Sequence, residues 1–350
     1  MASADARLAA DARLVRCTGC PRRCRADRRA GAHGWCAVGA AAEVAAVCLH
    51  RGEEPAISGE GGIANVFFAG CNLKCAYCQN WQISRQKPEA RGQRPEAKHR
   101  GPESVPTSEV CPGLRKSAPG RQTSEVGKDF GSLDAVAEEV VRLVDAGASA
   151  VGFVSTAHVA PQVEALAASL RARGTAAPFV LNTNAYESPE SLRSLSGLID
   201  VYLPDFKYAD GEVAERLSGA RDYPVAALAA LRLIHARTGS DLVLDDSGLA
   251  RRGLIIRHLV LPGHVRNSIE CLRTIASEIS PAVWLSLMSQ YQPTPEVAGD
   301  PDLGRRLRPE EYQAVLAEAD RLGFENGWCQ EPESADDWNP DFERQQPFAG

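Results

Sequence analysis

The chain has 350 residues, of which 44% are hydrophobic, and a formal net charge of −6 at pH 7. This length and apolar content predict one large or two ordinary folded domains. The negative net charge does not predict a basic surface that binds nucleic acid. No stretch approaches the roughly 18 to 20 apolar residues that span a bilayer, and residues 1–16 lack the apolar core of a secretion signal. We therefore expect a cytoplasmic protein without membrane or nucleic-acid partners.

Four cysteines near the N-terminus, Cys17, Cys20, Cys24 and Cys36, have the spacing of a metal-ligand set that starts with CxxC. Most of the eleven cysteines lie between residues 17 and 78, which favours metal ligation in a reducing compartment over a disulfide framework. Four thiolates would close a site, and the CxxC start is common to zinc and iron-sulfur loops. Residues 1–60 are therefore predicted to be a small N-terminal metal-binding segment, with zinc or iron-sulfur left open and free thiols as the alternative.

A second set, Cys71, Cys75 and Cys78, follows the apolar, strand-like residues 63–69 with CxxxCxxC spacing. Structural zinc and ordinary iron-sulfur clusters are normally held by four protein ligands. Three local thiolates therefore imply a distant fourth ligand or an iron left open to a small molecule. We favour the open iron over half of a zinc site or three unpaired thiols.

Residues 85–128 interrupt the chain with six prolines, ten Lys or Arg residues and no aromatic residue. Such a segment cannot bury enough apolar surface to offset its ordering entropy, so we expect it to be disordered. Cys111, within it, is expected to be incidental rather than a ligand. We also expect the acidic tail, residues 324–350, to be flexible.

Between residues 61 and 323, short apolar runs alternate with helical patterns, which indicates an α/β fold with a parallel sheet and crossover helices. Six strands are expected, at residues 63–69, 151–155, 179–182, 201–204, 254–261 and 283–288. Six such units are too few for a closed eight-stranded barrel but suit a partial (β/α)6 TIM-like barrel. The loops after the strands would then bring the three-cysteine run to one rim with residues 155–158, 182–184 and 205–207.

The three-cysteine run, including Tyr77 immediately before the third cysteine, resembles the signature of the radical S-adenosylmethionine (radical SAM) superfamily. In that superfamily three thiolates hold a 4Fe-4S cluster whose fourth iron binds S-adenosylmethionine. The reduced cluster cleaves the sulfonium, and a 5′-deoxyadenosyl radical abstracts a hydrogen from the substrate. The resemblance therefore implies both cofactors, contact between Tyr77 and the cofactor site, and the partial barrel that is typical of these enzymes.

Longer blocks, at residues 53–59, 182–188, 200–208 and 251–263, resemble homologues of pyruvate formate-lyase activating enzyme that carry an N-terminal cysteine segment. This resemblance implies that Asp205, Lys207 and His258 line the S-adenosylmethionine pocket. It also implies a glycyl-radical protein as partner and an electron donor such as a flavodoxin or ferredoxin. Without the resemblance, Asp205 and Lys207 would be a surface ion pair, and His258 a core histidine bonded to the backbone.

One motif departs from the superfamily pattern. A Gly-Gly-Glu-like turn usually follows the second strand and binds the methionine ammonium, whereas this chain has Ser155-Thr156-Ala157-His158. Thr156 and neutral His158 could each accept an ammonium hydrogen bond, but neither supplies a carboxylate charge. With Asn182 at the same rim, they complete the predicted cofactor contacts, and no residue is assigned a catalytic role.

The sequence thus predicts a radical SAM enzyme, with activation of a glycyl-radical enzyme as the activity that the resemblance implies. An enzyme of the same class acting on a small molecule or peptide is one alternative. A non-catalytic, zinc-stabilised binding scaffold is the other. No residue pattern identifies the substrate.

Overall fold

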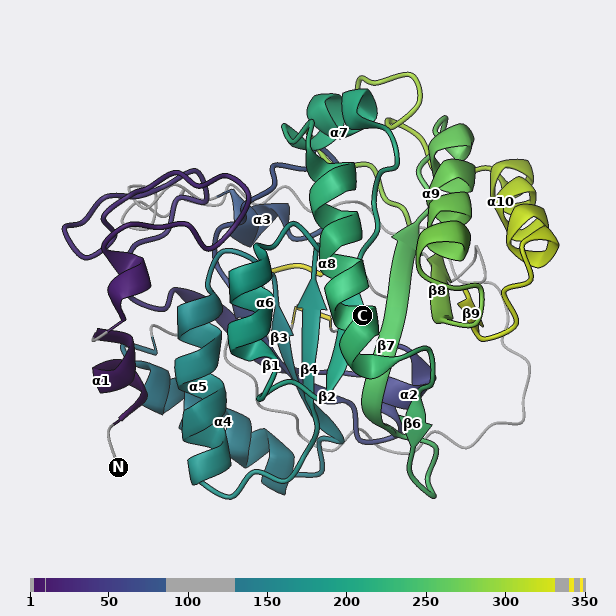
Figure 1. Ribbon diagram of the computed structural model, residues 1–350. Helices are drawn as coiled ribbons and strands as arrows, with labels where there is room; N and C mark the ends of the chain where they lie inside the picture. The colour runs from purple at the N-terminus through teal and green to yellow at the C-terminus, as the bar shows by residue number, and fades with distance from the viewer. Residues whose placement is uncertain (1–2, 10, 86–129, 331–339, 343–346, 349–350) are drawn as a thin grey trace, which may run out of the picture.

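The computed structural model describes residues 3–9, 11–85, 130–330, 340–342 and 347–348 (Figure 1). The insertion that we expect to be disordered, with Cys111, lies outside the described residues apart from Arg85. No helix in the described part of the chain is long and apolar enough to cross a membrane.

A mixed sheet forms the centre of the fold. Its strands are β1 (Val44–His50), β2 (Ile63–Phe68), β3 (Ala150–Val154), β4 (Phe179–Thr183), β5 (Val201–Pro204), β6 (Val243–Leu244), β7 (Ala250–Leu259), β8 (Trp284–Met288) and β9 (Gly327–Cys329). The order is β1-β2-β3-β4-β5-β7-β8-β9, with β6 attached to β7. All pairs from β2 to β9 along this path are parallel, whereas β1 and β6 are antiparallel to their partners.

Because successive parallel strands are neighbours, right-handed crossovers place the connecting helices on one side of the sheet. Figure 1 shows the longer helices along that side: α4 (Leu133–Asp145), α5 (Ala160–Ala172), α6 (Pro189–Leu195), α8 (Tyr223–Thr238), α9 (Val265–Glu278) and α10 (Pro309–Arg321). Short helices occupy the loops: α1 (Ala4–Ala9), the 3-10 turn at Ala12–Leu14, α2 (Pro55–Ser58), α3 (Trp81–Ser84) and α7 (Gly211–Ser218). The strands therefore have an outer, helix-covered face and an inner face.

Strand alternation divides the apolar side chains between these faces. On β3, Val151 and Phe153 join the large core that also contains the helix side chains, whereas Ala150 and Val154 belong to smaller clusters on the opposite face. This alternation decides which strand residues can reach a site on the inner face.

All six predicted strands are present and parallel, with ends shifted by up to four residues. The sequence analysis did not predict β1, β6 or β9. The predicted boundary at residue 60, between the N-terminal metal-binding segment and the α/β domain, falls between β1 and β2. These two strands nevertheless pair along the length of β1. Within the described residues β1 and β9 are the two edges of the sheet and do not pair, so closure into a barrel is not observed.

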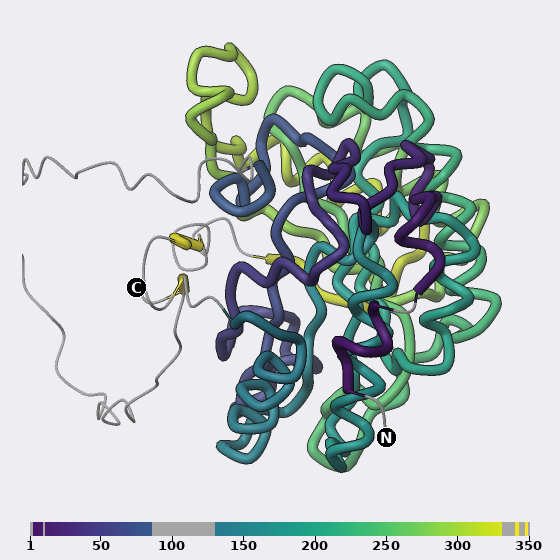
Figure 2. The backbone as a smooth tube through the Cα atoms, turned by 90° about the vertical axis from the view of Figure 1, so that its left-hand side faces the viewer, coloured from purple at the N-terminus to yellow at the C-terminus, as the bar shows by residue number. Residues whose placement is uncertain are grey.

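Parts of the tail, which we expect to be flexible, lie against the sheet in the structure. Residues Gly327–Cys329 form β9 beside β8. Further along, Phe342 is buried and its ring packs edge-to-face on Phe67 of β2, with 5.2 Å between ring centroids. Figure 2 shows these tail pieces on the side of the sheet opposite the helices. Isolated aromatic residues in an acidic segment thus dock on the inner face.

Candidate functional site

The three-cysteine run forms the loop that leaves the carboxyl end of β2. Gly70 starts this loop with φ +74°, and a Cβ atom there would lie 2.3 Å from the carbonyl oxygen of Cys36. Only glycine fits such a close approach. The thiols of Cys71, Cys75 and Cys78 all line one cavity of about 190 Å³.

Hydrogen-bond donors surround these thiols. The Leu73 amide lies 3.4 Å from Cys71 Sγ, and the Asn184 side-chain amide donates to the same sulfur at 3.5 Å. The Ser218 hydroxyl donates to Cys75 Sγ at 3.0 Å. Donors of this kind stabilise the thiolate form, which is the form that binds metal.

The electrostatics of the loop call for a positively charged occupant. Burial, reinforced by the neighbouring thiols of Cys75 and Cys78, raises the pKa of Cys71 to about 12. Burial also raises the pKa of Cys75, although Lys207 opposes the shift. Three neighbouring thiolates repel one another unless iron or another metal neutralises them. The donor set therefore fits an iron-sulfur cluster held at three corners.

Asp205 and Lys207, predicted from the loop after β5, line the same cavity and form an ion pair of 2.6 Å between Lys207 Nζ and Asp205 Oδ2. Their side chains are 19% and 18% exposed, so the pair is largely buried rather than a surface pair. Burial alone lowers the pKa of Lys207, but Asp205 and the thiolates of Cys75 and Cys78 outweigh it and raise the pKa above its ordinary value. Lys207 is thus a fixed positive charge beside the thiols.

Tyr77 and Asn182 also line this cavity, as expected. Tyr77 is buried, and its hydroxyl accepts a hydrogen bond from the Tyr208 hydroxyl at 2.7 Å. Asn182 projects from the end of β4 on the inner face, where it also borders a larger cavity described below. The structure thus brings seven predicted residues to one place: Tyr77, Asn182, Asp205, Lys207 and the three cysteines.

Thr156 and His158 do not line this cavity, and their contacts with the cofactor stay predictions. Thr156 is fully buried and donates to Glu187 Oε1 at 3.5 Å. The His158 ring bonds to the Ala69 carbonyl at 2.9 Å, and burial lowers the pKa of His158 to about 4. The cause is the backbone at Ser155, whose φ of +62° turns Ser155 itself into the cavity while the next residues pass behind it.

His258 is likewise absent from the lining of this cavity, and its contact with the cofactor stays a prediction. Its Nδ1 bonds to the Phe206 carbonyl at 2.7 Å, so it is a core histidine bonded to the backbone. Its neighbours Arg257 and Leu259 line the cavity instead. Successive side chains of β7 point to opposite faces of the sheet, and His258 is at a position that points to the outer face.

Arg257 is the main residue that the sequence analysis missed. Its guanidinium is 9% exposed and pairs with Glu53 and Glu54, with 2.8 Å from Nε to Glu54 Oε1. The pKa of Glu53 is lowered to about 2, because burial, which raises it, is outweighed by Arg257. All three residues lie in blocks quoted for the family resemblance, and strand parity within residues 251–263 could have identified Arg257.

This ion cluster borders a larger cavity of about 430 Å³ on the inner face of the sheet. The two cavities share seven lining residues: Gln79, Asn80, Val154, Asn182, Arg257, Met288 and Gln290. The larger one extends from this shared wall past β1 and β9 to the docked tail, where Phe348 lines it. A ligand there would adjoin the thiol-lined cavity.

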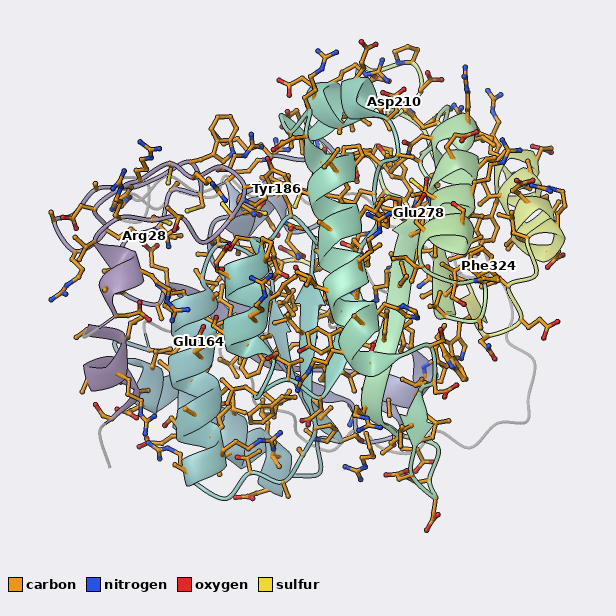
Figure 3. The ribbon with its side chains drawn as sticks, in the orientation of Figure 1. Arg28, Glu164, Tyr186, Asp210, Glu278 and Phe324 are labelled. Carbon is orange, nitrogen blue, oxygen red and sulfur yellow. The ribbon has the colours of Figure 1, made fainter. Side chains whose placement is uncertain are left out.

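The N-terminal cysteines pack against the three-cysteine loop. Cys17, Cys20 and Cys36 are buried, whereas Cys24 is exposed. Burial raises the pKa of Cys20 to about 11, although the side chain of Asn72 in the neighbouring loop donates to it. Figure 3 shows Arg28 of this segment and Tyr186 after β4 beyond the carboxyl ends of the strands.

A parallel α/β sheet with three thiols, an ion pair and a cavity at the carboxyl ends of its strands has the arrangement in which α/β enzymes place their active sites. The profile of the Radical SAM superfamily matches residues 65–246, more than half of the chain. The chain therefore belongs to the radical SAM superfamily, and membership implies a 4Fe-4S cluster and S-adenosylmethionine as cofactors.

Uncharacterized protein MJ0674 of Methanocaldococcus jannaschii is 26% identical over 277 residues, which cover 79% of this chain and 67% of that protein. Among solved structures, Streptococcus suis SuiB bound to the precursor peptide SuiA has 12% identity and a TM-score of 0.42. The alignment covers 76% of this chain and 48% of SuiB. SuiB bound to S-adenosylmethionine has 11% identity and a TM-score of 0.43, with 76% and 50% covered. The chain thus spans about half the length of these solved chains.

Proposed function

We propose that this chain reductively cleaves S-adenosylmethionine and uses the resulting radical to abstract a hydrogen atom. When bound by Cys71, Cys75 and Cys78, the cluster supplies the electron that breaks the carbon-sulfur bond, and the 5′-deoxyadenosyl radical takes the substrate hydrogen. The observation that carries the proposal is the single cavity lined by three thiols together with Asp205, Lys207 and Asn182.

The residues around that cavity have complementary tasks. Lys207 offers a fixed ammonium to the methionine carboxylate, and Asp205 offers acceptor oxygens to ribose hydroxyls or to the methionine ammonium. Asn182 can donate or accept, and Tyr77 closes the wall beside the thiols. Burial of these groups excludes water, which strengthens each contact and protects a reactive radical.

The substrate hydrogen is proposed to lie in the larger cavity, because its wall is shared with the thiol-lined cavity through Asn182, Arg257 and Met288. A group placed there adjoins the site where the radical forms. Arg257 and its two glutamates give this cavity a charged wall, so the substrate is expected to carry polar groups.

For the acceptor, we propose a glycyl-radical protein, with a flavodoxin or ferredoxin as electron donor. This part is supported by the resemblance of residues 53–59 and 251–263 to activating enzymes, and the structure adds that Glu53, Glu54 and Arg257 from these two blocks form one cluster. A small molecule or a peptide is the second candidate, because about 430 Å³ can hold such a ligand. Co-purification with a glycyl-radical protein separates the two.

The test is anaerobic reconstitution with iron and sulfide, reduction, and measurement of 5′-deoxyadenosine. We expect the wild type to form it and Cys75→Ala to lose both about one cluster of iron and the product. The matched control is Cys271→Ala, which removes a buried thiol from α9. A colourless wild type that contains only zinc would support the binding scaffold instead.

A further inference from the structure

An exposed aromatic side chain lies beside the three-cysteine loop. Trp35 is 41% exposed, although an indole ring gains much from burial. The Arg22 guanidinium carbon lies 4.2 Å from the centroid of its ring, and the Lys74 ammonium lies 4.3 Å from it. A Cβ atom at Gly219 would lie 3.5 Å from Cζ2 of the same ring, so Trp35 also packs on the connection between α7 and α8. Two cations thus hold the ring in place while much of it faces solvent.

Both cations connect Trp35 to the three-cysteine loop. Arg22 Nε donates to the Asn72 carbonyl at 3.0 Å, inside that loop. Lys74 belongs to the loop itself and immediately precedes Cys75. A partner that contacts Trp35 and Lys74 therefore comes within one residue of a cysteine that is proposed to hold the cluster.

The N-terminal segment around Trp35 is basic. Residues 12–36 contain seven arginines and one acidic residue, Asp27. Arg13 pairs with Glu164, and Arg28 is buried. The other arginines of this range, with Lys74, form no ion pair with a carboxylate in the described part of the chain: Arg16, Arg22, Arg23, Arg25, Arg29 and Lys74. Their positive charge is therefore not neutralised within the fold.

Two of these arginines lie near Trp35. The chain at Gly34 passes so close to Cys24 that a Cβ atom there would lie 2.5 Å from the Cys24 sulfur. Arg23 and Arg25, on either side of Cys24, are exposed and are thereby brought close to Trp35, which follows Gly34. We define the Trp35 surface as Arg22, Arg23, Arg25, Trp35 and Lys74.

The Trp35 surface is separate from the proposed substrate site. None of its five residues lines either of the two cavities described above. Figure 2 shows the N-terminal segment, in dark purple, facing the viewer and the docked tail pieces at the left. A partner that binds the Trp35 surface does not have to enter the larger cavity. The surface therefore suits a protein that acts on the cysteine loop rather than one that supplies the substrate hydrogen.

We propose that the Trp35 surface is the docking site of an acidic electron-transfer protein. This inference rests on the proposed function, because reductive cleavage of S-adenosylmethionine needs an electron from outside the chain. The docked donor is oxidised by one electron, and the cluster held by the three cysteines is reduced by it.

The composition of the surface fits such a partner. Unpaired arginines and a lysine attract an acidic protein and orient it, and a tryptophan among arginines is typical of an interface hot spot. Complexes of electron-transfer proteins are small and transient, so one aromatic anchor with a few charges is enough.

Binding to the full, anaerobically reconstituted chain tests the surface without any turnover. The probes are an oxidised flavodoxin and an oxidised ferredoxin, titrated by calorimetry at low salt. We expect Trp35→Ala and Lys74→Glu each to raise the dissociation constant about fivefold or more, and added salt to weaken binding by the wild type. The matched control is Arg252→Glu, which reverses an exposed charge near the start of β7, at the other end of the strands.

Three outcomes would overturn the proposal. The first is that the wild type binds neither probe. The second is that Lys74→Glu, which changes only an exposed side chain and so covers the case in which Trp35→Ala disturbs the N-terminal segment, binds as tightly as Arg252→Glu. The third is that a single-stranded oligonucleotide binds as tightly as the probes and is lost in the same variants, which would identify a nucleic-acid site.

A chemical reductant separates this proposal from the proposed function. Dithionite needs no docking site, so with it Trp35→Ala and Lys74→Glu should form 5′-deoxyadenosine at the wild-type rate. With limiting reduced flavodoxin their rates should fall about fivefold. Equal losses with both reductants would overturn the docking role. If the wild type forms no 5′-deoxyadenosine with dithionite, the proposed function fails, and the binding titration alone decides the surface.

Discussion

Arg257 and His258 are neighbours on β7, yet their side chains serve opposite faces of the sheet. Arg257 reaches the inner face, where it pairs with Glu53 and Glu54 and borders both cavities. His258 lies among the outer core and bonds to the Phe206 carbonyl. The two-residue period of a strand therefore places Arg257 on the inner face of the sheet and His258 on the outer face.

Removal of the arginine should destabilise the fold strongly. In Arg257→Gln, Glu53 and Glu54 would remain buried without their cation, so we expect the free energy of unfolding to fall by about 3 to 5 kcal/mol. Urea unfolding of the anaerobic protein measures this. The matched control, Arg232→Gln, breaks an exposed pair with Glu278 and should cost less than about 1 kcal/mol. Equal losses in the two variants would contradict the buried ion cluster.

His258 should make stability depend on pH in a defined window. Burial lowers its pKa from 6.5 to about 4, so the unfolded chain takes up a proton before the folded one does. The stability that this neutral histidine contributes is full above pH 6.5 and is lost as pH falls toward 4, by about 2 kcal/mol between pH 7 and pH 5. In His258→Asn, whose amide can still donate to Phe206, this part of the loss should vanish. An unchanged slope of unfolding free energy against pH would contradict it.

The parts of the fold that could be predicted are those with a local signal. The six strands from residue 63 to residue 288 are apolar runs bounded by turns, and all are present. The antiparallel β1 and the three-residue β9 are stabilised by pairing at the sheet edges, which no local pattern reveals. Phe342 docks through contacts with Phe67, some 275 residues distant in sequence.

The candidate site likewise contains some residues that the sequence could predict and others that it could not. The cysteine loop, Asp205 and Lys207 directly follow strands, so topology alone brings them to one rim. Thr156 and His158 also follow a strand, but the positive φ of Ser155 diverts them, and the sequence gives no sign of this at a non-glycine residue. Glu53 enters the site only because β1 and β2 form a hairpin that was not predicted.

Lys207 should control affinity for S-adenosylmethionine rather than cluster content. In Lys207→Met the cavity loses its ammonium next to Asp205. We expect the dissociation constant for S-adenosylmethionine to rise about ten- to hundredfold, because this change corresponds to the free energy of one hydrogen bond to a charged group. Iron content should stay at the wild-type value. The matched control is Lys74→Met, because Lys74 lies in the three-cysteine loop but its Nζ faces the Trp35 ring at 4.3 Å. A similar loss of affinity in both variants would remove Lys207 from the binding site.

The docked tail should open readily when its anchor is removed. Phe342 is 8% exposed and packs on Phe67, and its amide donates to the Gln82 side chain at 2.9 Å. Phe342→Ala removes about 1.5 to 3 kcal/mol of apolar burial, which corresponds to a ten- to hundredfold larger undocked population.

Hydrogen exchange at amide 342 measures this population, because exchange requires that the bond to Gln82 opens. We expect it to accelerate ten- to hundredfold in Phe342→Ala and less in Gln82→Ala, which loses the acceptor but keeps the aromatic contact. The control is Val225→Ala on α8, where the side chain is exposed and away from the tail. Since Phe348 lines the larger cavity, undocking should also open the proposed substrate site to water. Exchange at the wild-type rate in Phe342→Ala would show that the ring does not hold the tail.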